Sequence, residues 1–178
     1  MIEPRIVRRY ATALFRAANK AGIIDQVESD LGLVSYTIES SPRLAKVLRS
    51  PQIPRDVKQN ILRAIFEGKV HEVTLSYLFL LVDKRREEAM TATEAVFVEL
   101  ANEARGIVVV DVTSAIELTR QEENRLREKL SARTGKRVEL VVRIDPSVIG
   151  GLIVKIGDTL IDGSIRGQLI ALREKMIG

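Results

Sequence analysis

The chain contains few residues whose types and spacing would support catalysis. His71 is the only histidine among 178 residues and cysteine is absent, so neither a cysteine nucleophile nor a zinc site of ordinary composition is available. A serine–histidine–aspartate triad would have to use His71, and the chain has no Gly-x-Ser-x-Gly motif to present the serine. We therefore predict that His71 caps a helix or faces solvent.

An incomplete phosphate-loop motif, Thr-Gly-Lys-Arg, occurs at residues 134–137. Arg137 stands where the motif requires serine or threonine, and no glycine lies five positions before Gly135. The segment also leads from a predicted helix into a predicted strand, whereas phosphate binds at the N-terminus of a helix. We do not expect a nucleotide site here.

Acidic residues occur in two settings. Glu87-Glu88 and Glu122-Glu123 lie in charged helical segments near lysine and arginine, so we predict that they form solvated faces. Three aspartates instead follow predicted strands, where such side chains commonly accept hydrogen bonds from turns and helix caps: Asp145, Asp158 and Asp162. The sequence therefore predicts no catalytic, cofactor-binding or metal-binding residue.

Basic residues are concentrated at the start of the chain. The first 20 residues hold five of them and one carboxylate, which accounts for the whole net charge of +4. This patch either is a solvated helix face or docks an acidic or amphipathic partner. It is too short for the basic stripe that is typical of nucleic-acid-binding proteins, and residues 107–178 are nearly neutral.

Apolar residues at three- and four-residue spacings predict consecutive helices over residues 1–105. The fifth of them, about residues 70–86, is apolar on most sides, so we place it at the centre of a bundle. A core that is rich in alanine and leucine, with only 4% aromatic residues in the chain, suits a helix bundle. The longest apolar run, residues 77–82, is far below the ~20 residues that span a bilayer, so membrane association would go through a partner.

The pattern changes after Gly106. A β-branched run at 107–111 predicts a strand, and residues 119–134 predict a charged helix. Three short strands follow at 140–144, 152–156 and 159–161, with a hairpin turn at Gly157-Asp158 and a last helix that starts near residues 162–164. We therefore predict an α+β chain in which a six-helix bundle (1–105) precedes a small α/β domain (106–178) with a short mixed sheet. The sequence does not fix the strand order.

Five segments, in this order and spacing, resemble the delta subunit of F-type ATP synthases, whose mitochondrial relative is the oligomycin-sensitivity-conferring protein. They are residues 9–15, 81–86, 107–115, 144–151 and 161–166. The resemblance extends over nearly the whole chain. It implies a non-catalytic stator subunit that links the alpha/beta catalytic head to the b-subunit peripheral stalk, so that rotation is coupled to ATP synthesis and proton transport.

The resemblance also implies the partners. A groove between the first and fifth helices would bind the N-terminal helix of an alpha subunit, and the C-terminal domain would bind the C-terminal ends of the b subunits, or of b and b′. The complex would lie on the cytoplasmic face of a bacterial plasma membrane, or on the matrix or stromal face in an organelle. The subunit would reach the membrane only through the complex, and no nucleic acid is expected.

Carried over by position, eight residues would form the groove: Tyr10, Ala13, Leu14 and Ala17 from the first helix, and Tyr77, Leu78, Leu81 and Arg85 from the fifth. The same spacing also suits residues that pack only against their own bundle, and periodicity alone leaves these two interpretations open. The rival function is a small helical regulatory or nucleic-acid-binding protein. It predicts salt-sensitive binding to DNA or RNA, which the charge distribution disfavours.

Overall fold

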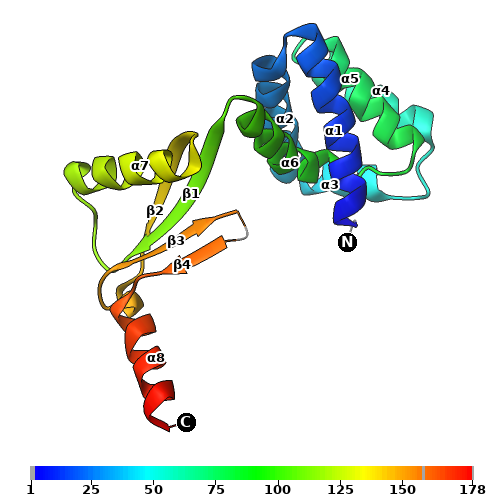
Figure 1. Cartoon of the computed structure of the whole chain (residues 1–178). Helices are drawn as coiled ribbons and strands as arrows, with labels where there is room; N and C mark the ends of the chain where they lie inside the picture. The colour runs from blue at the N-terminus through cyan, green and yellow to red at the C-terminus, as the bar shows by residue number, and fades with distance from the viewer. Residues whose placement is uncertain (1–2, 158, 178) are drawn as a thin grey trace. The chain divides into compact units, whose positions relative to one another are not determined.

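A computed structural model describes residues 3–157 and 159–177. Its contacts divide the chain into two compact units, Met1–Ala101 and Asn102–Gly178. Six helices in contact form the first unit, and a four-stranded mixed sheet with helices forms most of the second (Figure 1). The predicted α+β fold class is therefore confirmed. No helix in the described part is both long and apolar enough to cross a membrane.

The helices of the first unit begin and end at residues with clear structural reasons. Pro4 suits the first turn of α1 because its missing N–H would be unpaired there. Gly22 then ends α1 in the left-handed conformation, with φ +69°. Ser41 caps α3 by accepting a hydrogen bond from the Leu44 N–H at 3.3 Å. The six helices are α1 (Pro4–Ala21), α2 (Ile24–Glu39), α3 (Pro42–Arg49), α4 (Arg55–Phe66), α5 (Glu72–Asp83) and α6 (Ala89–Ala104).

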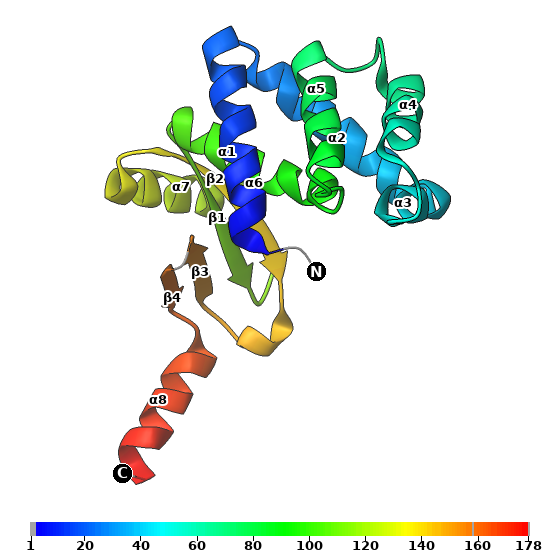
Figure 2. The same ribbon diagram turned by 90° about the vertical axis from the view of Figure 1, so that its right-hand side faces the viewer.

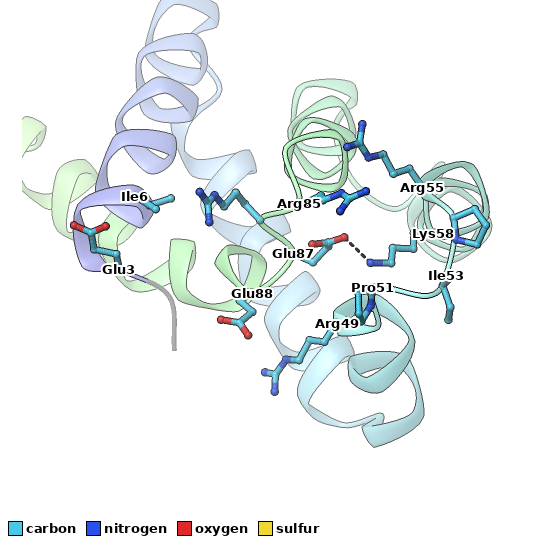
Figure 3. A pocket seen from close by; sticks show the side chains of 12 residues that line it. Glu3, Ile6, Arg49, Pro51, Ile53, Arg55, Lys58, Arg85, Glu87 and Glu88 are labelled. Atoms are coloured by element: carbon cyan, nitrogen blue, oxygen red, sulfur yellow. Dashed lines mark hydrogen bonds and ion pairs between the residues drawn. The ribbon is translucent and has the colours of Figure 1, made fainter.

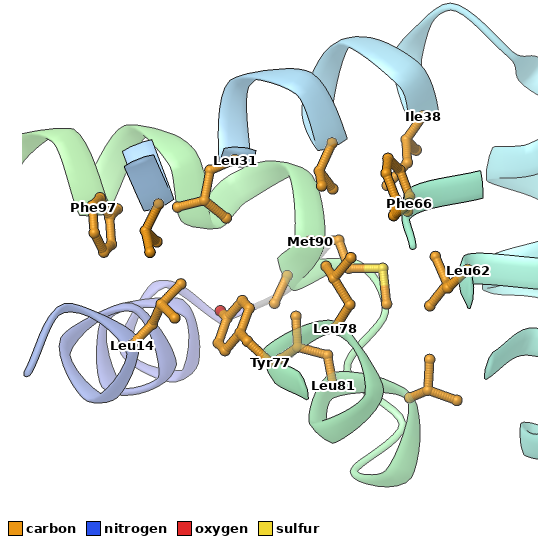
Figure 4. Packing of buried hydrophobic residues seen from close by; sticks show 14 of the residues in the cluster. Leu14, Leu31, Ile38, Leu62, Phe66, Tyr77, Leu78, Leu81, Met90 and Phe97 are labelled. Carbon is orange, nitrogen blue, oxygen red and sulfur yellow. The ribbon is translucent and has the colours of Figure 1, made fainter. Parts of the chain in front are cut away.

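The core of this unit is filled by large apolar side chains from all six helices. Leu31, Phe66, Leu78 and Met90 are almost completely buried and converge between the helices (Figure 4). Each such side chain stabilises the fold by about 1.5–3 kcal/mol through removal of apolar surface from water. The bundle is thus held by its core, and its surface side chains remain available for other roles.

A buried ion pair contradicts the prediction that Glu87 lies on a solvated helix face. The Lys58 ammonium lies 2.6 Å from a Glu87 carboxylate oxygen, and the two side chains are only 5% and 11% exposed. The predicted solvated face is therefore wrong for Glu87. Its partner, Lys58 on α4, lies 29 residues earlier in the chain, so no local sequence pattern predicts this contact.

The second unit is built on a sheet with strand order β2-β1-β3-β4. The central strand β1 runs parallel to β2 and antiparallel to β3, which in turn is antiparallel to β4. β1 and β2 are longer than the predicted strands at 107–111 and 140–144, because they pair over eight residues, from Ile107↔Arg137 to Ser114↔Ile144. β3 has the predicted bounds, 152–156, and β4 extends one residue beyond the predicted 159–161. The elements are β1 (Ile107–Ser114), α7 (Arg120–Thr134), β2 (Arg137–Ile144), η1 (Pro146–Val148), β3 (Leu152–Ile156), β4 (Thr159–Asp162) and α8 (Ile165–Ile177).

Two of the three predicted turn aspartates have the expected role. A carboxylate oxygen of Asp145 accepts the Ser147 N–H at 2.9 Å, and one of Asp162 accepts the Ser164 N–H at 2.8 Å. Hydrogen bonds from these serines lower the pKa of each carboxyl below its usual value. Asp158 lies outside the described residues, so the predicted turn at residues 157–158 is described only at Gly157.

Candidate partner-binding groove

A shallow groove of about 420 Å³ lies between α1 and α5, which run beside each other in the bundle (Figure 2). Small and apolar side chains dominate its lining. The lining residues are Ala13, Leu14 and Ala17 from α1, and Glu72, Val73, Ser76, Tyr77 and Leu80 from α5. We call this feature the α1/α5 groove.

The groove has a buried floor and exposed walls. Leu14 and Tyr77 are only 3% and 5% exposed and form the floor. Ala13 and Ala17 are exposed on one wall, and Leu80 is 39% exposed on the other. Since alanine side chains project little, a helix backbone can approach α1 closely along this wall.

A buried hydrogen bond fixes the Tyr77 ring in the floor. The Tyr77 hydroxyl lies 2.7 Å from Thr93 Oγ1, which in turn donates to the Ala89 carbonyl at 2.6 Å. Burial raises the pKa of Tyr77 to about 12, so the phenol stays neutral at ordinary pH. The floor is therefore preorganised and uncharged.

The N-terminus of α5 is also fixed in place. His71 Nδ1 accepts the Val73 N–H at 3.2 Å, which confirms the predicted capping role of this histidine. The buried carboxylate of Asp30 on α2 accepts the His71 N–H at 2.7 Å and the Thr74 hydroxyl at 2.8 Å. These contacts hold the first turn of α5, which contributes Glu72 and Val73 to the groove.

Four of the eight predicted site residues line the groove: Ala13, Leu14, Ala17 and Tyr77. Tyr10 is half-buried and packs against the bundle core. Leu78 and Leu81 have no exposed surface and face the core beneath the groove. In this structure they belong to the same apolar core as the floor residues Leu14 and Tyr77.

The helical period explains which residues of α5 the sequence missed. Val73, Ser76, Tyr77 and Leu80 follow the spacing i, i+3, i+4 and i+7, so they share one face. Leu78 is turned ~100° from Tyr77, toward the core. Ser76 is a signal of this face in the sequence, because it is polar within the otherwise apolar segment 75–82. A helix predicted to be central thus has one open side.

Arg85 lies in a different feature, a hollow of about 590 Å³ whose lining includes the α3–α4 and α5–α6 connections. Figure 3 shows Arg49, Arg55 and Arg85 around the Lys58–Glu87 pair. Arg85 lies just after the C-cap of α5 in the left-handed conformation, with φ +54°, and the N–H of the next residue donates to the Leu81 carbonyl at 2.8 Å. We call this feature the polar hollow.

Neither feature carries a catalytic arrangement. Among the side chains that the structure describes, no group of three or more histidine, cysteine, aspartate or glutamate residues is placed to hold a metal ion. The groove has an apolar floor and walls that include small side chains, and this combination suits the binding of another protein segment.

Comparison with known proteins assigns the family. The family described as ATP synthase delta (OSCP) subunit matches residues 6–176. ATP synthase subunit delta of Symbiobacterium thermophilum is 40% identical over 177 residues, which are 99% of this chain and 95% of that protein. The corresponding subunit of Desulforamulus reducens is 41% identical over 177 residues, with 99% and 98% covered.

A solved structure shares the fold. A chain of the mitochondrial ATP synthase hexamer of Toxoplasma gondii superimposes with a TM-score of 0.68 at 22% identity, covering 97% of each chain. This likeness concerns the fold, whereas the sequence matches over almost the full length carry the assignment. The chain belongs to the ATP synthase delta (OSCP) subunit family.

Proposed function

We propose that the α1/α5 groove binds the N-terminal helix of an ATP synthase alpha subunit, and that the C-terminal unit binds the C-terminal ends of the b subunits, or of b and b′. As a delta (OSCP) subunit, the chain is a non-catalytic stator component of F-type ATP synthase. A stator must resist the torque that rotation of the central stalk applies to the catalytic head. It therefore needs two separate docking surfaces and no reactive group.

The shape of the groove is the observation that carries the first half of the proposal. An amphipathic helix binds a groove through apolar residues at positions i, i+3, i+4 and i+7. The fixed floor of Leu14 and Tyr77 would receive such residues, and the exposed Ala13 and Ala17 would allow the helix to lie close to α1. Because the floor is preorganised, little ordering entropy is lost on binding.

The second half of the proposal is supported by apolar side chains on α8. Ile165, Leu169 and Leu172 are 45%, 53% and 56% exposed and follow the spacing i, i+4 and i+7. They form a stripe along one side of the helix. A helical end of a b subunit would cover this stripe by side-to-side packing.

We further propose that the subunit is peripheral to the membrane and is held there by the complex. The face would be cytoplasmic in a bacterium, or that of the matrix or stroma in an organelle. The family membership supports this proposal. ATP synthase transports protons across a membrane, so its delta subunit would be held near that membrane by the other subunits.

Calorimetry with two synthetic peptides, one from the alpha N-terminus and one from the b C-terminus, tests both halves. Ala17→Leu fills the groove from an exposed position, so we expect it to abolish binding of the alpha peptide and to preserve binding of the b peptide. Leu169→Asp should do the reverse. Ala64 is also an exposed alanine and lies on α4, outside the groove, so Ala64→Leu is the matched control and should bind both peptides like the unaltered chain.

Loss of alpha binding in both alanine variants, or in neither, would show that the groove is not the site. Loss of both peptides in the Leu169→Asp variant, with an unchanged melting temperature, would contradict two independent docking surfaces.

A further inference from the structure

The wall of the groove that α1 provides continues into a strongly cationic surface. A second, open depression of about 530 Å³ is lined by residues of α1 alone and meets the groove at Ala13, which lines both. Its lining residues are Arg5, Arg8, Arg9, Thr12, Ala13 and Arg16. Arg9, Ala13 and Arg16 follow the spacing i, i+4 and i+7, so the arginines form a stripe along the edge of the groove.

Most of this charge is not neutralised within the bundle. Arg8 pairs with the Glu99 carboxylate at 3.3 Å, and both side chains are 57% exposed. Arg9 stacks over the Tyr10 ring with 5.3 Å between its guanidinium carbon and the ring centre. Among the described residues, no ion pair involves Arg5, Arg9 or Arg16.

The position of these arginines is also unfavourable for the helix itself. The N-terminus of a helix carries partial positive charge, so acidic residues stabilise the first turn and basic ones destabilise it. The first turn of α1 has no acidic residue, and Arg5, Arg8 and Arg9 lie in its first two turns. The interaction with the helix dipole therefore does not explain why these arginines lie at the start of α1.

The opposite wall differs in charge. Glu72 is the charged residue that α5 contributes to the groove lining, and it is exposed, whereas the Tyr77 phenol in the floor stays neutral. The groove thus has a cationic edge along α1 and a carboxylate on α5, so an occupant lying in it meets opposite charges on its two sides.

We infer that the groove selects an amphipathic helix whose acidic side chains flank its apolar stripe on the side that faces α1. This inference rests on the proposed function, because it specifies the charge pattern of the alpha-subunit helix that the groove would bind. The apolar floor supplies affinity, while the arginine stripe sets the rotation of the bound helix and speeds its association.

The test is the salt dependence of alpha-peptide binding by the full chain. The Arg9→Gln/Arg16→Gln double variant removes two charges from the edge of the groove. The control, Arg43→Gln/Arg55→Gln, removes two exposed arginines from α3 and α4, away from the groove. We expect the first pair to weaken binding about three- to tenfold at low salt and to flatten the dependence on salt. The control should leave both properties unchanged.

The outcomes separate the two claims. Equal salt dependence in the unaltered chain and the Arg9→Gln/Arg16→Gln variant would overturn the charge inference, even if Ala17→Leu still blocked binding. Equal weakening by the control pair would also overturn it, because net charge and not the stripe would then be responsible. Absence of peptide binding by the folded, unaltered chain at every salt concentration would overturn the proposed function together with this inference.

Discussion

The polar hollow and the α1/α5 groove are of comparable size, about 590 and 420 Å³, and have opposite chemistry. The polar hollow surrounds an ion pair that is satisfied within the chain, because Lys58 and Glu87 contact each other at 2.6 Å. The α1/α5 groove has an apolar floor, and its alanines, Ala13 and Ala17, are exposed in the described structure. A large concave surface is thus a poor guide to function by itself. The more informative property is whether the groups that line the surface are paired within the chain or remain exposed to a partner.

The comparison predicts that the polar hollow is needed for stability and not for alpha binding. Glu87→Ala leaves the Lys58 ammonium buried and unpaired, so we expect the free energy of unfolding to fall by about 3–5 kcal/mol. Urea denaturation measures this. Lys58→Met/Glu87→Leu removes both charges and should recover most of the loss.

The exposed Arg8–Glu99 pair gives a control for this effect. Both side chains are 57% exposed, so Glu99→Ala should change stability by no more than about 1 kcal/mol. A loss of similar size in the Glu87 and Glu99 variants would mean that burial does not distinguish the two pairs.

A somewhat smaller effect is predicted for the floor of the groove at high pH. Burial raises the pKa of Tyr77 from 10.0 to about 12. The folded state therefore holds its proton more tightly than the unfolded state. The stabilisation is complete below pH 10 and is lost as pH rises from 10 to 12, by about 3 kcal/mol.

The measurement is the difference in unfolding free energy between the unaltered chain and Tyr77→Phe across this pH range. Tyr36→Phe serves as control, because Tyr36 is 71% exposed. If the two variants show the same pH dependence, the Tyr77 hydroxyl is not buried in the way that the structure places it.

Local sequence patterns predicted the secondary structure well, and pairings between distant segments less well. The six helices, the four strands and the cap at His71 follow from periodicity, glycines and turn residues within short windows. The strand order β2-β1-β3-β4 depends on contacts between segments far apart, as does the burial of Glu87 under Lys58. No local pattern contains that information.

Only part of the groove lining could be predicted, and the α1 side was easier to assign than the α5 side. The apolar stripe of α1 is one-sided, so Ala13, Leu14 and Ala17 could be assigned from spacing together with the family resemblance. The sequence of α5 is apolar on nearly all sides, so its open face could not be told from its core face. The packed bundle resolves this, since it buries Leu78 and leaves Leu80 partly exposed.

The most direct test of the central claim is photo-cross-linking in the reassembled enzyme. The chain lacks cysteine, so Ser76→Cys gives a single attachment point for a benzophenone probe in the groove, and Ala64→Cys gives an exposed control on α4. Our account predicts that the probe at position 76 forms a covalent product with the N-terminal segment of an alpha subunit, whereas the probe at position 64 does not. Equal products from both positions, or none from position 76 in a fully assembled complex, would contradict it.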